Sequence, residues 1–145
     1  MRVVVQKVTY SSVSVDNKVI NEINKGLNVL VGFTEGDSDK EIVYLTKKVL
    51  NLRVFEDENG VMNKSVIDVG GEILLISQFT LYGDCNKGNR PSYIKALGGD
   101  KAEPLYLEFG KKLNESIPTK LGIFGADMNV VIHNDGPTTI IIDSK

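Results

Sequence analysis

The segment RVVVQKVTYSSVSV, residues 2–15, decides the class of fold that this sequence can form. It is rich in β-branched residues, above all valine, and these favour β-strands. Asp16 and Asn17 separate it from a second short run, so the sequence predicts a hairpin here. The apolar segment from Leu27 to Phe33 predicts a strand that is buried on both faces. Because the connections between these strands are too short for parallel crossovers, we expect antiparallel pairing.

Two amphipathic segments predict helices outside the sheet. The first begins at Ser38 and Glu41, which form a capping-box pattern. Apolar residues follow at helical spacing and form one face: Ile42, Leu45, Val49 and Leu52. We expect the second helix to begin between Asp100 and Pro104, because proline is tolerated in the first turn. Its apolar face has a similar spacing: Leu105, Phe109 and Leu113.

Three further strands complete the predicted fold. One is EILLISQF, residues 72–79. Two late strands are expected at residues 127–133 and 138–143, joined by a turn at NDGP, residues 134–137. We therefore predict one α+β domain over residues 1–145, with mostly antiparallel sheets curled into a barrel-like core and two helices packed outside.

Composition narrows the class of protein. Of the 145 residues, 41% are hydrophobic and 25% are charged, as in ordinary soluble globular proteins. The sequence contains no run of about 18 apolar residues, so we expect no membrane span. The single cysteine, Cys85, cannot form an internal disulfide, which favours a cytoplasmic location. One cysteine and one histidine also cannot build the usual kind of zinc site. The alternative of a carboxylate site for Mg²⁺ stays open, but no tight acidic cluster suggests one, and we expect neither a metal nor a cofactor.

Charge limits any nucleic-acid binding to a local surface. The net charge of −2 is unlike that of proteins that hold nucleic acid through bulk positive charge. The loop between Asp84 and Lys101, however, holds four cations against two carboxylates. Either this is an ordinary solvated loop, or its side chains Lys87, Arg90 and Lys95 contact phosphates.

The segment Ser77-Gln78-Phe79-Thr80 turns polar at the end of an apolar run. Backbone N–H groups at a strand end, with side-chain donors beside them, can stabilise a developing oxyanion. The alternative is that the serine and threonine only cap the strand and the glutamine faces water. A conventional nucleophile also needs a base. The only histidine, His133, is better interpreted as a strand residue without a catalytic role.

The segment NDGPTT, residues 134–139, carries strong turn signals. The simplest interpretation is an ordinary β-turn between two strands. Alternatively, the bond before Pro137 is cis, which occurs in about 5–6% of X–Pro bonds in folded proteins and is usually a specific device. The sequence alone does not distinguish the two isomers.

Together, SQFTLYGD (residues 77–84) and NDGPTT resemble the two signature motifs of the D-aminoacyl-tRNA deacylase family, also called D-tyrosyl-tRNA deacylase. The resemblance runs along the whole chain, in the order VQKVTYSSVSV, GLNVLVG, VLNLRVFEDENGVMNKSV and NRPSY. It implies a hydrolase that cleaves the ester of D-aminoacyl-tRNA, and of mischarged glycyl-tRNA, without a cofactor. Such an enzyme serves translation quality control by releasing the D-amino acid and the tRNA.

The resemblance also implies how the two motifs work together. It implies a homodimer in which Gly136-Pro137 of one subunit, joined by a cis bond, enters the pocket of the other and excludes L side chains. The pocket wall would consist of four consecutive residues: Ser77, Gln78, Phe79 and Thr80. Backbone N–H groups around Phe79 and Thr80 would form the oxyanion site. A threonine hydroxyl without a base is a weak nucleophile, so we favour an orienting role for Thr80.

Other residues acquire expected roles from the same resemblance. Phe124 and Met128 lie in the segment that would hold the terminal adenosine. The loop cations Lys87, Arg90 and Lys95 would meet the phosphate backbone of the tRNA. The ribose 2′-OH of the substrate would orient or activate the attacking water.

Two other functions remain open. A non-catalytic RNA-binding module would bind tRNA ends without turnover, although the acidic composition and the lack of an aromatic stripe argue against it. A small-molecule esterase would need a basic residue near Ser77 or Thr80, and His133 is the only histidine available.

Overall fold

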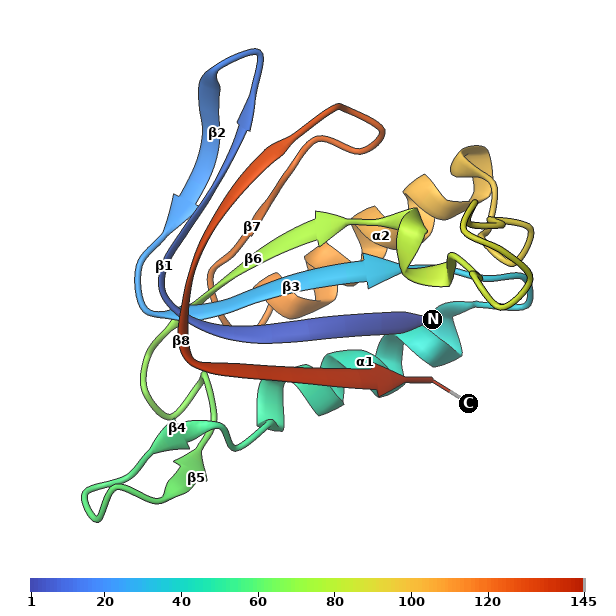
Figure 1. Cartoon of the computed structure of the whole chain (residues 1–145). Helices are drawn as coiled ribbons and strands as arrows, with labels where there is room; N and C mark the ends of the chain where they lie inside the picture. The colour runs from blue at the N-terminus through green and yellow to red at the C-terminus, as the bar shows by residue number, and fades with distance from the viewer. Residues whose placement is uncertain (145) are drawn as a thin grey trace.

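A computed structural model describes residues 1–144 of the chain (Figure 1). Six strands form one mixed sheet: β1 (Arg2–Val15), β2 (Lys18–Ile23), β3 (Gly26–Gly32), β6 (Glu72–Ser77), β7 (Thr119–Leu121) and β8 (Asn129–Asp143). The other elements are α1 (Asp39–Asn51), the hairpin strands β4 (Phe55–Glu56) and β5 (Met62–Lys64), the 3₁₀-helix η1 (Phe79–Tyr82) and α2 (Gly99–Asn114).

β1 organises the sheet because it is paired on both edges. On one edge its first half pairs with β3 and its second half with β2, while β8 follows it on the other edge. The predicted hairpin between β1 and β2 is confirmed. Asp16 and Asn17 have φ angles of 50° and 62°, as a two-residue type I′ turn requires.

The sheet is strongly curled (Figure 1). In the order β2-β1-β3-β6-β7, the outer strands β2 and β7 are joined by side chains. Asn21 Nδ2 donates a hydrogen bond to the Leu121 carbonyl at 2.7 Å, and Lys120 Nζ donates to the Glu22 carbonyl at 2.8 Å. The predicted barrel-like α+β architecture with two helices is therefore confirmed.

Two strand pairs differ in direction from the antiparallel majority. β3 pairs with β6, and β6 with β7, in parallel. The reason is that α1 lies in the connection between the first pair and α2 in the connection between the second, and such crossovers return the chain in the same direction. Consequently the carboxyl ends of β3, β6 and β7 lie at the same edge of the sheet.

α1 forms as the sequence predicts. The Ser38 N–H donates to Glu41 Oε2 at 2.8 Å and the Ser38 hydroxyl accepts from the Lys40 N–H, completing the N-terminal cap. The buried face consists of Ile42, Leu45, Val49 and Leu50. Leu52 follows the helix as its C-cap and packs at the margin of the core.

α2 begins slightly earlier than expected. Its first residue is Gly99, one before the predicted start, so Pro104 lies in the second turn and not in the first. The helix continues through the proline because its inner face is held by the core, where Tyr106, Phe109 and Leu113 are buried. Burial of such large side chains is worth about 1.5–3 kcal/mol each, enough to offset one missing backbone hydrogen bond.

The prediction of two late strands joined by a turn is wrong. β8 is one continuous strand from Asn129 to Asp143, and NDGP lies inside it. β8 pairs with β1 on both sides of this segment: Gln6 lies opposite Thr139 and Val8 lies opposite Asn134. The turn-forming residues therefore form a bulge, because β1 is long enough to hold both halves of β8 on the same edge.

A substitution at Gly26 tests the close parallel pairing of β3 and β6. A Cβ atom added there would lie 1.9 Å from the Glu72 carbonyl oxygen in the neighbouring strand. We expect Gly26→Ala to lower the free energy of unfolding by about 3 kcal/mol, the cost of overpacking a rigid backbone contact. Urea denaturation followed by circular dichroism measures the change.

Gly99→Ala is the matched control, because its Cβ would make only ordinary contact, 3.6 Å from the Phe124 ring. It should change the free energy of unfolding by no more than about 0.5 kcal/mol. Equal stability of the two variants would contradict the close approach of β3 and β6.

Candidate active site

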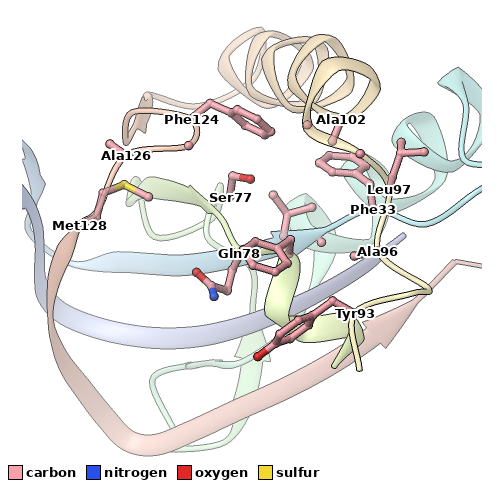
Figure 2. Close-up of a pocket in the computed structure, with 16 residues that line it drawn as sticks. Phe33, Ser77, Gln78, Tyr93, Ala96, Leu97, Ala102, Phe124, Ala126 and Met128 are labelled. Atoms are coloured by element: carbon pink, nitrogen blue, oxygen red, sulfur yellow. The ribbon is translucent and has the colours of Figure 1, made fainter. Parts of the chain in front are cut away.

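A pocket of about 470 Å³ opens where the parallel strands β3 and β6 end (Figure 2). Its walls come from the strand ends, from the loop before α2, from the start of α2 and from the segment between β7 and β8. Most of the lining is apolar or glycine: Val31, Gly32, Phe33, Phe79, Tyr93, Ala96, Leu97, Gly98, Gly99, Ala102, Phe124, Gly125, Ala126 and Met128. The polar exceptions are Ser77 and Gln78.

Ser77 is the last residue of β6, and its hydroxyl points into the pocket (Figure 2). Side chains alternate along a strand, so Ser77 shares its face with the buried Ile73 and Leu75. The next residue is fixed by the sheet, because the Gln78 N–H donates to the Val31 carbonyl at 2.7 Å. β3 and β6 together therefore position both polar groups.

η1 follows directly and turns the chain at the pocket wall. Phe79 and Thr80 are its first two residues, and the first N–H groups of a helix have no acceptor within that helix. The Thr80 side chain is exposed and does not line the pocket. Its hydroxyl accepts a hydrogen bond from the carboxamide of Gln78. This contact fixes the hydroxyl and engages one of its lone pairs.

The opposite wall is built from the segment between β7 and β8. Phe124 and Met128 lie there, as the sequence predicts, and both line the pocket. The Phe124 ring packs against Tyr106, with centroids 5.7 Å apart. The Tyr106 hydroxyl donates to the Leu75 carbonyl at 2.7 Å, which ties α2 to β6 behind the pocket. Burial raises the pKa of the Tyr106 hydroxyl above its ordinary value.

Several lining residues were not predicted from the sequence. Phe33 and Ala102 have no chemical signal, because apolar residues that line a pocket look like ordinary core residues. Tyr93 lies at the mouth, where its ring meets the edge of Phe79 with centroids 5.1 Å apart. Two signals pointed towards it: it lies in the loop that also carries the predicted cations, and it ends the family-like segment NRPSY, residues 89–93.

The predicted basic patch lies on the exposed loop between η1 and α2. Lys87, Arg90 and Lys95 are all exposed, and Lys95 Nζ lies 3.7 Å from an Asp84 carboxylate oxygen. The loop is fixed at its base, because Asp84 and Ser92 exchange two backbone hydrogen bonds of 2.9 Å. The patch and the pocket mouth therefore belong to one anchored loop.

Gly136 and Pro137 are the predicted residues that the chain does not bring to its own pocket. They are exposed in the bulge of β8, and the peptide bond between them is cis, as the resemblance implied. His133 is also outside the pocket, exposed on β8 with its ring 5.2 Å from that of Tyr10. Cys85 is exposed and unpaired.

The pocket is poor in ionisable groups. Of the lining residues within positions 1–144, only Tyr93 has an ionisable side chain. Over the same described residues, no group of three histidine, cysteine or acidic side chains lies close enough together to hold a metal ion. No helix in the described part of the chain is long and apolar enough to cross a membrane. The chemistry available at the pocket wall is that of backbone amides, a hydroxyl and a carboxamide.

These features define a class: a barrel-like mixed-sheet protein with an apolar pocket whose polar groups are hydrogen-bond donors, not a charged triad. The chain matches the family described as D-Tyr-tRNA(Tyr) deacylase over residues 4–143. It is 62% identical to the D-aminoacyl-tRNA deacylase of Clostridium novyi and 58% identical to that of Clostridium acetobutylicum, over 100% of this chain and 98% of each relative. The protein belongs to the D-Tyr-tRNA(Tyr) deacylase family, which confirms the predicted class of hydrolase.

Two solved structures share the fold of this chain. The structure described as c-Myc DNA Unwinding Element Binding Protein is 44% identical, with a TM-score of 0.95, and covers 100% of this chain and 99% of its own. A probable eukaryotic D-amino acid tRNA deacylase is 19% identical with a TM-score of 0.84 over 99% of this chain and 98% of its own, and it shows the shared fold.

The raised pKa of Tyr106 predicts how stability depends on alkaline pH. The folded state holds this proton more tightly than the unfolded state, so its stabilising effect is complete below about pH 10, the ordinary pKa of tyrosine, and is lost as the pH rises further. Urea denaturation across this range should show the free energy of unfolding falling more steeply for the wild type than for Tyr106→Phe.

Tyr106→Phe removes the hydrogen bond to Leu75 as well, so it should begin about 1 kcal/mol less stable near neutral pH. Lysines titrate in the same range, and the comparison with the variant removes their common effect. Parallel curves for the two proteins would contradict the buried, protonated state of Tyr106.

Proposed function

We propose that the protein hydrolyses the ester of D-aminoacyl-tRNA, releasing the free D-amino acid and the tRNA, and that it also cleaves mischarged glycyl-tRNA. The observation that carries the proposal is the pocket itself. It combines apolar walls with the Ser77 hydroxyl, η1 begins at its wall with Phe79, and it belongs to a chain of the deacylase family. The same activity would remove D-amino acids from translation.

The reaction needs little from the protein because the aminoacyl ester is activated. Water attacks the ester carbonyl carbon, and the carbonyl oxygen takes up negative charge. The N–H groups of Phe79 and Thr80 would stabilise that oxyanion, as preorganised donors do in acyl transfer. The bond to the ribose oxygen then breaks, and this oxygen takes a proton. The neighbouring ribose 2′-OH of the substrate orients or activates the attacking water.

Thr80 acts in this scheme as an orienting group. Its hydroxyl is held by the Gln78 carboxamide, and it lacks a histidine or carboxylate partner among the lining residues of the described chain. A hydroxyl without a base is a weak nucleophile. The contact instead fixes the first turn of η1, where the proposed oxyanion donors lie.

The apolar wall opposite is suited to the terminal adenosine. Phe124 offers a ring face held in place by Tyr106, and Met128 offers a polarisable thioether beside it. Aromatic side chains bind nucleobases by stacking, largely independently of the base. We assign the adenosine to these two residues and the aminoacyl group to the side of Ser77.

Selectivity for the D-amino acid is proposed to come from a second copy of the chain. Gly136 and Pro137 are exposed and do not line their own pocket, so they can reach such a pocket only in a partner subunit. In the proposed homodimer their backbone occupies the space that an L side chain needs. Glycine has no side chain, so this steric filter does not exclude it.

Two simpler features go with this proposal. We propose that residues 1–145 form one domain, since one apolar core is shared by β1, β3, β6 and both helices. We also propose that the enzyme acts in the cytoplasm, where its free thiol at Cys85 stays reduced.

A deacylation assay in EDTA tests the function. We expect rapid loss of D-tyrosyl-tRNA and slow loss of L-tyrosyl-tRNA, because the proposed site uses no metal and its filter acts on the L side chain. The released tyrosine and the remaining aminoacyl-tRNA are measured over time. Uncatalysed hydrolysis of each ester in buffer is the control.

Three other outcomes contradict the proposal. Binding of tRNA without cleavage of either ester indicates an RNA-binding module. Equal cleavage of simple esters and aminoacyl-tRNA indicates a general esterase. Activity that EDTA removes and a divalent cation restores indicates metal-dependent chemistry.

The basic loop makes a separate prediction about tRNA binding. If Lys87 and Arg90 each meet a phosphate, then Lys87→Gln and Arg90→Gln should each reduce the slope of log affinity against log salt by about 0.7–0.9. Lys64→Gln is the control, because Lys64 pairs with Glu58 at 2.6 Å on the β4–β5 hairpin, at the opposite end of the molecule (Figure 1). Equal slopes in all four proteins would place the tRNA backbone elsewhere.

A further inference from the structure

The bulge of β8 contains more residues than the opposite strand can pair. Between Gln6–Thr139 and Val8–Asn134, β1 has one residue, Lys7, where β8 has the four residues 135–138. Within positions 1–144, no β1 residue is registered opposite these four. The exposed tip at Gly136-Pro137 is therefore not positioned by the strand ladder, and its position depends on side chains.

The side-chain carboxamide of Asn134 makes hydrogen bonds at the place where β1 and β8 have no registered backbone pairs. Its Nδ2 donates to the Lys7 carbonyl at 3.0 Å and to the Thr138 carbonyl at 3.1 Å. It thus joins the two sides of the gap, since Lys7 is the β1 residue without a registered β8 partner at this point and Thr138 is the last of the four extra residues. The carbonyl oxygen of the same carboxamide accepts from Gln6 Nε2 at 3.2 Å.

A hydroxyl extends this network to the tip. Thr139 Oγ1 lies 3.2 Å from Asn134 Oδ1 and 3.1 Å from the Pro137 carbonyl, so its single hydrogen serves one of these two acceptors. On the other side, Lys7 Nζ lies 3.9 Å from a carboxylate oxygen of Asp135. The Lys7 side chain is only 8% exposed, so this charge is held under the bulge.

We propose that Asn134 is a positioning residue for stereoselectivity. It holds the Gly136-Pro137 backbone in the position from which, in the proposed homodimer, that backbone excludes an L side chain. The inference rests on the proposed function, and it concerns residues that lie outside the pocket. Asn134 uses both donor directions of its carboxamide, and its Oδ1 accepts from Gln6 and lies within hydrogen-bond distance of the Thr139 hydroxyl. Its role is to set a distance, and it takes no part in bond breaking.

The hydrogen bonds that the Asn134 carboxamide donates can be removed without changing the shape of the side chain. Asn134→Asp preserves shape and both acceptors but places a carboxylate against the Lys7 and Thr138 carbonyl oxygens, which repels them. Thr139→Val removes the hydroxyl and keeps the side-chain shape. Thr139→Ser keeps the hydroxyl and serves as the conservative rescue. Asn51→Asp, at an exposed position on α1, is the matched control for an asparagine-to-aspartate change.

The experiment measures kcat/KM for three substrates: D-tyrosyl-tRNA, L-tyrosyl-tRNA and glycyl-tRNA. In Asn134→Asp we expect the value for the L-ester to rise about tenfold or more relative to the D-ester, as a displaced steric filter admits the side chain. The glycyl value should stay within about twofold, because glycine has nothing for the filter to exclude. Thr139→Val should shift the L-to-D ratio in the same direction, and Thr139→Ser and Asn51→Asp should retain the wild-type ratio.

The outcomes separate this inference from the proposed function. A wild-type protein that spares the L-ester, with ratios unchanged in both Asn134→Asp and Thr139→Val, overturns the inference and leaves the function standing. A uniform fall for all three substrates, with a lower midpoint of unfolding, assigns Asn134 a merely structural role and also overturns it. A wild-type protein that cleaves neither tyrosyl ester overturns both.

Discussion

The pairing of β1 on both of its edges is the constraint on which the rest of the structure depends. Because β3 and β2 share one edge, β1 must bend between them, and the sheet curls until β2 reaches β7. β8 has to follow the same bend on the opposite edge. It does so with extra residues in the middle, and these are pushed out of the sheet as the bulge that carries Gly136 and Pro137.

The pocket has a different origin in the same sheet. The two helical crossovers make β3, β6 and β7 parallel, which brings the ends of three strands to one place. Side chains beyond those ends no longer have a neighbouring strand to cover them, and α2 and the loop before it leave a hollow there. The site is apolar because it is a continuation of the core. Its few polar groups therefore act in a medium where each hydrogen bond is stronger than in water.

The sequence predicted the features that are determined by residues close together in the chain, such as helix caps and tight turns. The capping box at Ser38 and the hairpin at Asp16-Asn17 appear where the sequence places them, whereas the strand predicted over residues 72–79 ends at Ser77, because η1 begins at Phe79. NDGP was assigned to a turn because the same residue types serve turns and bulges, and only the length of β1 distinguishes them. The parallel strand pairs and the pocket lining depend on contacts between residues that are distant in sequence. An apolar residue that lines a pocket also looks the same in the sequence as one that is buried in the core.

The bulge has one more effect, on the outer edge of β8. In the described chain this edge pairs with no other strand. Its unpaired backbone N–H and C=O groups are therefore available for pairing with a strand of another molecule. Pro137 has no N–H to offer, and the looped-out residues break the regular spacing that a foreign strand would need. The exposed edge is thus split into two short stretches. The same irregularity that the proposed reaction uses for selectivity protects the folded protein against aggregation.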